Sequence, residues 1–425
     1  MRQIPRTPGG DSMKLRDVDL TDPDLFQRGT PHEMFALLRR DSPVYWHEEK
    51  RGSGFWAITK HADLKWISKR PELFSSAAQG TLRDDPPAEA LPLIRNIMLN
   101  MDPPQHRQYR NLINKAFTPR MVNELVPHVR EIVKRIINGV IEKGECDFVE
   151  EVAAILPMEV ICEMMGVPEE DRRRIYEIGN SMVGFDDPEL QPDGKLREMT
   201  ANSAQEAFGQ MFVYANKLRE KALAHPSNDL ATALLTVELD GKKLSELEFS
   251  YFFLLLLIAG NETTRTVTTN GMIALLENPE QHALLQRDLS LVDSAVEEIL
   301  RYAPAVHTFR RQAMADVELR DRKIRAGDKV MLWYSSVNRD EEVFTDPNKF
   351  DIRRSPNDHL AFGIGEHYCL GANLARMELQ EIFRAIATHF HDMEMTARPR
   401  RLRSTFINGV KEMRVRFRPG ATLET

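Results

Sequence analysis

The sequence predicts a mainly α-helical protein with a small β region. Apolar residues recur every three or four positions through most of the stretch from Ala62 to Leu289, as in helices that bury one face. Two short runs of β-favouring residues, Val44–His47 and Phe55–Ile58, precede that stretch. No repeat, low-complexity tract or Ser/Gly linker divides the 425 residues, which weighs against separable domains although the length alone would allow two or three.

The amino-terminal part is expected to begin without regular structure. Residues 1–30 are rich in Pro, Gly and Asp and predict a poorly ordered lead-in, so that the folded domain covers residues 31–425. The charged, Gly-containing segment 48–54 lies between the two β-type runs and predicts a hairpin.

The rest of the chain predicts further helices, loops and strands. Segments 77–92 and 185–194 contain several prolines and predict long loops, which are often functional. A helix from about Ser245 to Glu277 would be on the order of 50 Å long. Beyond Glu297 the pattern is mixed, with strand-like runs at 329–334 and 413–417 and a strong helix from Leu370 to His389.

Composition and charge exclude several classes of protein. The chain has 57 Lys and Arg against 64 Asp and Glu, and its net charge of −7 excludes a polycationic arm for nucleic acid. Its 3 cysteines form no disulfide framework and no Cys-x-x-Cys pair, which favours a reducing compartment. The amino terminus lacks a signal-peptide pattern, and the longest apolar run, Tyr251–Ala259, is too short to span a bilayer. We therefore expect a cytoplasmic protein with no membrane span and no nucleic-acid partner.

One cysteine lies in a Gly-rich loop just before the predicted helix 370–389. Glycines at 363, 365 and 371 permit positive φ and close backbone approach, and the helix start and backbone N–H groups favour a thiolate at Cys369. Such a sulfur can ligate a metal. An isolated cysteine is otherwise most simply a small buried hydrophobic residue.

The spacing around this cysteine favours the metal ligand. Phe362, Gly365, His367, Cys369 and Gly371 fill all five fixed positions of the pattern Phe-x-x-Gly-x-His-x-Cys-x-Gly. In this loop the chain resembles the cytochrome P450 superfamily. The resemblance implies a single triangular, mostly helical domain that binds heme b, with Cys369 as the iron ligand and Phe362 covering its sulfur; thiolate ligation favours O–O cleavage.

A second matching segment lies within the long predicted helix. Leu256, Ala259, Gly260 and Thr263 share one helix face, and an interior Gly followed by Glu262 and two threonines is costly in a buried helix unless a ligand lies beside it. Alternatively, Gly260 is a helix-packing contact and Glu262 a solvated carboxylate. The resemblance places Gly260 over the haem and implies that Thr263, with Glu262 as its acidic neighbour, delivers protons.

A third matching segment is an acid and an arginine one helical turn apart. Glu298 and Arg301 are on their own most simply an exposed ion pair, but their order before the cysteine loop matches the Glu-x-x-Arg structural pair of the family. The family often completes this network with an arginine in Pro-x-Arg-Phe, where this chain has Lys349. We expect Lys349 or Arg353 to substitute.

Four further residues are candidates for the two haem propionates, which need cationic or hydrogen-bonding partners when buried. His106 and Arg110 lie one helical turn apart, and Arg311 and His367 match two other propionate partners of the family. Each alone is most simply a solvated surface residue. Their shared order along the chain favours the cofactor.

The resemblance implies a monooxygenase. Two electrons and two protons reduce O2, and one oxygen atom enters a C–H bond of the substrate. No segment resembles a flavin or nicotinamide domain, so we expect electrons from a separate ferredoxin with its reductase. The cations Arg107, Lys115 and Arg120 are candidates for the docking face, unless they are merely a solvated helix face. A peroxide-driven peroxygenase and a non-catalytic haem sensor are the alternatives.

The substrate is expected to be lipophilic, because the expected pocket is largely apolar. The segments around Gly184 and Gly260 resemble the bacterial branch that hydroxylates sterol side chains, methyl-branched lipids and terpenoids, which favours terminal C–H hydroxylation. Segments 77–98 and 182–194 are expected to cap the pocket. The expected lining residues are Val306, Phe309, Phe406, Ile407 and part of 185–190.

Overall fold

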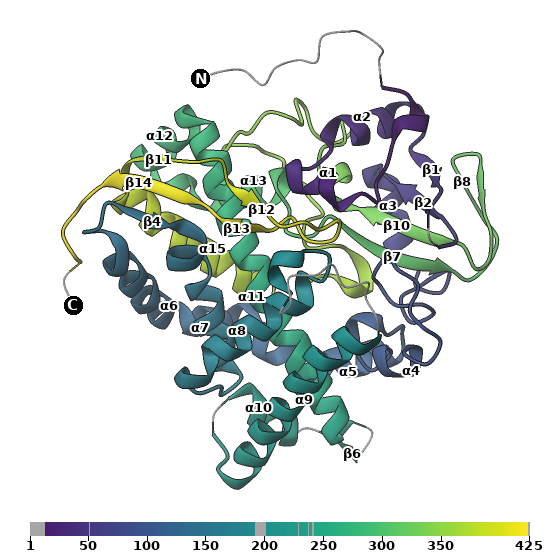
Figure 1. Cartoon of the computed structure of the whole chain (residues 1–425), viewed down its shortest axis with the longest axis horizontal. Helices are drawn as coiled ribbons and strands as arrows, with labels where there is room; N and C mark the ends of the chain where they lie inside the picture. Colours follow the sequence, from purple (N-terminus) through teal and green to yellow (C-terminus); the bar gives the residue numbers. More distant parts are fainter. Residues whose placement is uncertain are drawn as a thin grey trace.

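The protein is built mainly from helices. The computed structural model describes residues 13–50, 52–191, 201–227, 229–236, 238–239 and 242–423 of the chain. Helices account for about 53% of it, and the strands form small sheets. In Figure 1 the helices fill the centre and one side, and the largest sheet lies at the other side. The predicted fold class is therefore confirmed.

The long central helix, α11 (Glu246–Glu277), organises the helical part. Ser245 caps its first turn and Glu248 reaches back to the backbone of Ser245, so a capping box fixes the start of the helix. α11 is buried along most of its length and packs against α7, α9 and α15. Its bounds agree with those predicted from the sequence.

The other helices surround α11 or cover the sheet (Figure 1). They are α1 (Pro23–Arg28), α2 (His32–Asp41), α3 (His61–Ser68), α4 (Leu91–Ile94), α5 (Gln105–Ile113), α6 (Pro119–Val140), α7 (Ile155–Met164), α8 (Glu169–Val183), α9 (Ala201–Ala224), α10 (Leu230–Thr236), α12 (Pro279–Arg287), α13 (Val292–Tyr302), α14 (Tyr334–Val337) and α15 (Ala372–His389).

The largest sheet has the strand order β1-β2-β10-β7-β3. The first two strands form the predicted antiparallel hairpin, with Val44 opposite Ile58. The next strand is parallel, with Val330 beside Trp56, so the hairpin pairs with a segment far along the chain. These strands are β1 (Val44–His47), β2 (Phe55–Ile58), β3 (Phe74–Ser75), β7 (Thr308–Ala313) and β10 (Lys329–Trp333).

The remaining strands form smaller sheets. β14 lies between β4 and β11, and three pairs of strands form separate ribbons. The predicted runs 329–334 and 413–417 correspond to β10 and β14. The strands are β4 (Glu145–Asp147), β5 (Glu238–Leu239), β6 (Lys242–Lys243), β8 (Val317–Leu319), β9 (Arg322–Ile324), β11 (His391–Met395), β12 (Arg400–Arg401), β13 (Val410–Glu412) and β14 (Arg414–Arg418).

The expected lead-in over residues 1–30 needs a correction. Residues 1–12 lie outside the described residues, but Pro23–Arg28 forms α1, with Asp22 capping the backbone N–H of Asp24. Leu20 and Phe26 are buried, with exposed fractions of 0% and 3%. Pro and Asp, which suggested an unstructured segment, here supply the first turn and the cap of a helix.

The two predicted long loops contain only short helical turns. Segment 77–92 runs through turns into α4, and segment 185–194 includes a 3-10 turn at Pro188–Leu190. Residues 192–194 of the second loop lie outside the described residues.

Candidate active site

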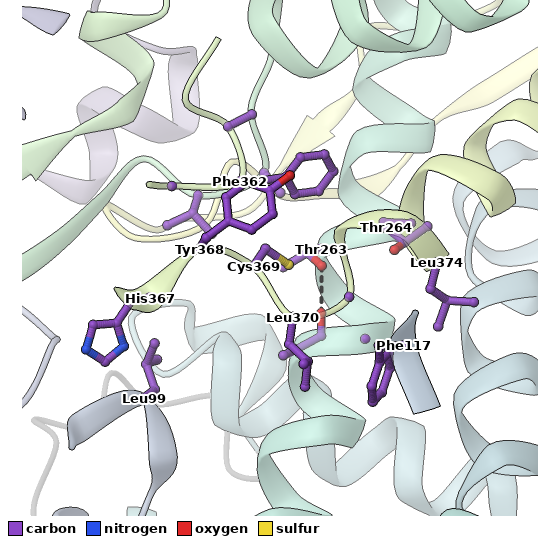
Figure 2. A pocket seen from close by; sticks show the side chains of 18 of the residues that line it. Leu99, Phe117, Thr263, Thr264, Phe362, His367, Tyr368, Cys369, Leu370 and Leu374 are labelled. Atoms are coloured by element: carbon purple, nitrogen blue, oxygen red, sulfur yellow. Dashed lines mark hydrogen bonds between the residues drawn. The ribbon is translucent and has the colours of Figure 1, made fainter. Parts of the chain in front are cut away.

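A cavity of about 250 Å³ lies between α11 and the loop that precedes α15. Its walls also include residues of α5, β7 and α15. Figure 2 shows side chains that line the cavity, among them Thr263, His367 and Cys369. Eight of the predicted site residues line it, although they come from segments far apart in the sequence. They are His106, Arg110, Gly260, Thr263, Arg311, Phe362, His367 and Cys369.

Cys369 lies at the end of a tight loop. Its backbone N–H donates to the carbonyl oxygen of Phe362 at 2.8 Å, which closes the loop. Gly363 and Gly365 have φ of +69° and +79°, and a Cβ at Gly365 would lie 2.4 Å from a backbone oxygen. These two glycines behave as predicted.

The electrostatics of the sulfur differ from the sequence prediction. Burial raises the pKa of the Cys369 thiol, while the backbone N–H of Gly371 and the charges of Arg110 and Arg376 lower it. In this environment the thiolate is favoured only when a metal ion binds it. Gly371 has an ordinary φ of −84°, and no atom lies within 4 Å of the position of a Cβ there.

Four nitrogen-bearing side chains gather at another wall of the cavity. His106 and Arg110 project from successive turns of α5, and the ring of His106 lies 4.2 Å from that of His367. Arg311 on β7 is buried, with an exposed fraction of 5%. Its neighbour Arg310 points to the opposite face of the strand, because successive strand residues alternate, and pairs with Asp85 at 2.7 Å.

Among the described residues, no carboxylate pairs with Arg110 or Arg311, and His106 and His367 lie beside them as neutral rings. Burial, aided by the neighbouring arginines, lowers the pKa of His106 to about 4 and of His367 to about 2. Nδ1 of His106 is buried without a hydrogen-bond partner, and no ion pair to Arg110 or Arg311 occurs among the described residues. A cofactor that carries carboxylates would satisfy these groups. A haem, with two propionates and an iron for Cys369, therefore fits the residues present.

The face of α11 turned to the cavity is the one predicted from the sequence. Leu256, Ala259, Gly260 and Thr263 all line the cavity. The hydroxyl of Thr263 donates to the carbonyl oxygen of Ala259 at 2.6 Å, the bond drawn in Figure 2.

Gly260 combines the two roles that the sequence left open. It lines the cavity, and a Cβ there would lie 3.1 Å from the side chain of Ile161 on α7. The glycine thus permits close packing of α7 on α11 in the wall of the cavity.

Glu262 lies apart from the other site residues. Its carboxylate is buried at 4% exposure and pairs with Arg265 at 2.6 Å. Arg265 in turn donates to Tyr176 and to Asn180 on α8, the latter at 3.0 Å. The residue is not among those that line the cavity around Cys369, and it is not a solvated carboxylate either.

The Glu298–Arg301 pair is fully buried. The two side chains have exposed fractions of 0%, and Nε of Arg301 donates to Glu298 Oε2 at 2.7 Å. The expectation that Lys349 or Arg353 completes this network is wrong. Their side chains are 61% and 62% exposed and lie near Asp351 instead.

Arg354 completes this network. Its Nε lies 3.1 Å from Glu298 Oε2, and its other nitrogens bind three backbone carbonyl oxygens. The guanidinium reaches Glu298 from five residues beyond Lys349, the position that the motif order indicated, and one residue beyond Arg353. The pair therefore anchors the segment that leads to the cysteine loop.

Sequence reasoning missed Glu378, which lines the cavity from α15. Burial raises the pKa of its carboxyl to about 8, against a smaller opposite effect of a hydrogen bond with Thr264. No salt bridge involves it among the described residues, so at neutral pH it is an uncharged acid. Its place on the apolar stripe of α15, between Leu374 and Ile382, was the signal that could have identified it.

Some of the residues expected to line a substrate pocket do line the main cavity. Val306 and Phe309 line the main cavity. Phe406 packs against Phe309 with ring centroids 5.5 Å apart and lines a smaller cavity together with residues 185–186. Ile407 is buried and pairs with Val306 in a β-bridge.

Cavity, sulfur and cations together fit a class of enzyme that is built around a cofactor with anionic groups and a metal ion that a cysteine could hold. The sequence model of the family described as cytochrome P450 matches residues 83–408, and the chain belongs to the cytochrome P450 family. The family implies a haem cofactor.

Named relatives agree with this assignment. The steroid C26-monooxygenase of Mycolicibacterium smegmatis is 39% identical over 94% of this chain and 94% of that protein. The methyl-branched lipid omega-hydroxylase of Mycobacterium tuberculosis is 40% identical over 90% of each chain. A cytochrome P450 of Mycobacterium marinum in complex with pseudoionone has a TM-score of 0.86 and 35% identity, covering 94% of this chain and 98% of that one.

The protein is therefore a P450 monooxygenase, an oxidoreductase. Among the described residues, no helix combines the length and the apolar content needed to cross a bilayer.

Proposed function

We propose that this monooxygenase uses heme b, with Cys369 as the iron ligand and Phe362 beside its sulfur. The observation that supports this most directly is the meeting of one half-buried cysteine and four nitrogen-bearing side chains on a single cavity. His106, Arg110, Arg311 and His367 would hold the propionates. When bound, the haem supplies the oxygen-activating chemistry, and the chain positions substrate and protons.

We propose a lipophilic substrate that is hydroxylated at a terminal C–H bond of an aliphatic chain. The cavity walls formed by α11 and by the segment around the start of β7 contain the apolar side chains of Leu256, Val306 and Phe309. Relatives named for steroid C26 and for methyl-branched lipids support a sterol side chain, a branched lipid or a terpenoid. A narrow apolar channel would present the end of such a chain to the reacting centre and exclude water.

We propose that Thr263 and Glu262 deliver protons. The Thr263 hydroxyl lies in the cavity wall, where it can pass a proton from its oxygen to a reacting group. Glu262 precedes it on α11 and would supply protons to Thr263 through water. Because Glu262 is bound to Arg265, this role requires the carboxylate to exchange that partner for water during turnover.

We propose that electrons come from a separate ferredoxin with its reductase, in the cytoplasm. Lys115 and Arg120 are exposed, and the Arg107 side chain is 63% exposed although it pairs with Glu366, three residues before Cys369. This cationic group lies on the side of the cysteine loop, where an acidic partner would shorten the path to the haem.

The experiment is a spectrum followed by turnover. The reduced, carbon-monoxide-bound wild type should show the red-shifted band of a thiolate-ligated haem, and Cys369→Ala should lose it. A sterol with an aliphatic side chain, a methyl-branched fatty acid and pseudoionone are then offered with ferredoxin, reductase and O2.

Terminal hydroxylation of at least one of these compounds supports the proposal. A wild type without the red-shifted band removes Cys369 as the ligand. Turnover with hydrogen peroxide alone, but not with ferredoxin and O2, would establish the peroxygenase instead.

A further inference from the structure

Arg376 contacts two residues of the loop that precedes Cys369. It lies on α15, seven residues after the cysteine, and its guanidinium carbon is 4.6 Å from the ring centroid of Phe362. Its Nη1 donates to the hydroxyl of Tyr368 at 3.2 Å. One side chain thus contacts both the residue placed beside the sulfur and the immediate neighbour of the sulfur.

Glu297 on α13 fixes the position of Arg376. Nε and Nη2 of Arg376 donate to the two carboxylate oxygens of Glu297 at 2.6 and 2.9 Å, and Nε2 of His359 lies 3.0 Å from the same carboxylate. Burial opposes the charge on Glu297, but the bonds from His359 and Arg376 lower its pKa to about 2. The carboxylate is therefore ionised at neutral pH, and this bidentate bond holds the plane of the guanidinium.

The guanidinium of Arg376 places a positive charge close to Cys369, because it lies against the ring of Phe362 and donates to Tyr368, the residue just before the cysteine. Arg376 has no role in binding the cofactor carboxylates or the substrate, since it is not among the residues that line the cavity.

We propose that Arg376 is a positioning residue that fixes Phe362 beside the Cys369 sulfur and places a positive charge next to the iron–thiolate unit, and that Glu297 holds it there. This rests on the proposed ligation by Cys369. One-electron reduction of a ferric haem adds one negative charge to the iron–thiolate unit, so a nearby cation favours the reduced form. Arg376 should therefore raise the midpoint potential of the haem.

The chain offers a matched control, in which an arginine of α6 pairs with a carboxylate of α15. Arg130 donates to both carboxylate oxygens of Glu381 on α15 at 2.8 and 2.9 Å, the same bidentate arrangement, with no contact to the cysteine loop. Arg130→Met removes a guanidinium–carboxylate pair of α15 without touching Phe362 or Tyr368.

The test is a redox titration of the haem-loaded protein with mediators. Wild type must first show the red-shifted carbon-monoxide band, since its absence would refute the ligation and not the role of Arg376. At the wild-type midpoint, Arg376→Met should raise the ferric-to-ferrous ratio by about threefold or more, where tenfold corresponds to 59 mV. Arg130→Met should stay within twofold of wild type.

Two further variants separate charge from position. Arg376→Lys keeps the charge and should restore most of the ratio, but it loses the planar contact with Phe362 and should release haem to a scavenger faster than wild type. Glu297→Ala should shift the ratio in the same direction as Arg376→Met, because Arg376 is no longer held. If Glu297 acted only through its own negative charge, its removal would instead lower the ferric-to-ferrous ratio.

A ratio for Arg376→Met within twofold of wild type, with the red-shifted band intact, overturns the proposal. Loss of that band in Arg376→Met but not in Arg130→Met supports it, because thiolate ligation then depends on Arg376. A shift toward the ferrous form in Glu297→Ala removes Glu297 from the proposal.

Discussion

Glu378 should make the stability of the protein depend on pH in a way that a single isosteric substitution removes. Burial raises the pKa of this carboxyl from 4.5 to about 8, so the folded state keeps a proton that the unfolded chain releases above pH 4.5. The contribution of the protonated Glu378 carboxyl to the free energy of unfolding is therefore fully present below pH 4.5 and is lost as the pH rises toward 8. Each pH unit in that window lowers the free energy of unfolding by about 1.4 kcal/mol.

Glu378→Gln keeps the shape of the side chain and has no proton to lose. Between pH 5.5 and pH 8 the wild type should therefore lose about 3 kcal/mol relative to the variant. Urea unfolding of both proteins at the two pH values measures this difference, and subtraction removes the effect of all other titrating groups. Glu381→Gln, next turn on α15 and paired with Arg130 at 2.8 Å, should cost no more than about 0.5 kcal/mol.

A difference between wild type and Glu378→Gln that is equal at pH 5.5 and pH 8 would refute this reasoning. Infrared spectroscopy gives an independent measure, because a protonated carboxyl absorbs separately from a carboxylate. The wild type at pH 7 should show a protonated-carboxyl band that the variant lacks.

Three other substitutions test separate parts of the site. Thr263→Ala should keep the carbon-monoxide spectrum but divert reducing equivalents to hydrogen peroxide, measured as peroxide formed per electron pair; unchanged coupling removes the role of the hydroxyl. Arg311→Gln should weaken haem retention about tenfold in a scavenger assay, because a propionate loses a charged partner, and wild-type retention would contradict the assignment. Arg354→Ala should lower the free energy of unfolding by about 2 kcal/mol, since Glu298 loses a guanidinium; Lys349→Ala should stay within about 0.5 kcal/mol, and equal losses would contradict the network.

Sequence reasoning succeeded where chemistry and order along the chain carried the information. The helix from Ser245 to Glu277 was predicted with its bounds, because Ser245 and Glu248 encode its start locally. The candidate residues from His106 to Cys369 were found one by one, and the fold brings eight of them onto one cavity.

It failed where the answer depends on three-dimensional contacts. No local pattern distinguishes Arg354 from Lys349 or Arg353, because only the folded loop decides which side chain reaches Glu298. Glu262 follows the cavity-lining face of α11 in sequence, but successive residues of a helix point about 100° apart, so only the folded structure shows that its carboxylate pairs with Arg265.

The pairing of the amino-terminal hairpin has a consequence for how the chain is made. Trp56 in β2 pairs with Val330 in β10, which follows about 270 residues later in the chain. The ribosome therefore completes the hairpin long before β10 is synthesised. At 5–20 residues per second this interval is roughly 14 to 55 seconds. During this interval, the backbone donors and acceptors along the β2 edge of the hairpin are unpaired and can bind another nascent strand. Slow translation lengthens the time for which this edge is exposed.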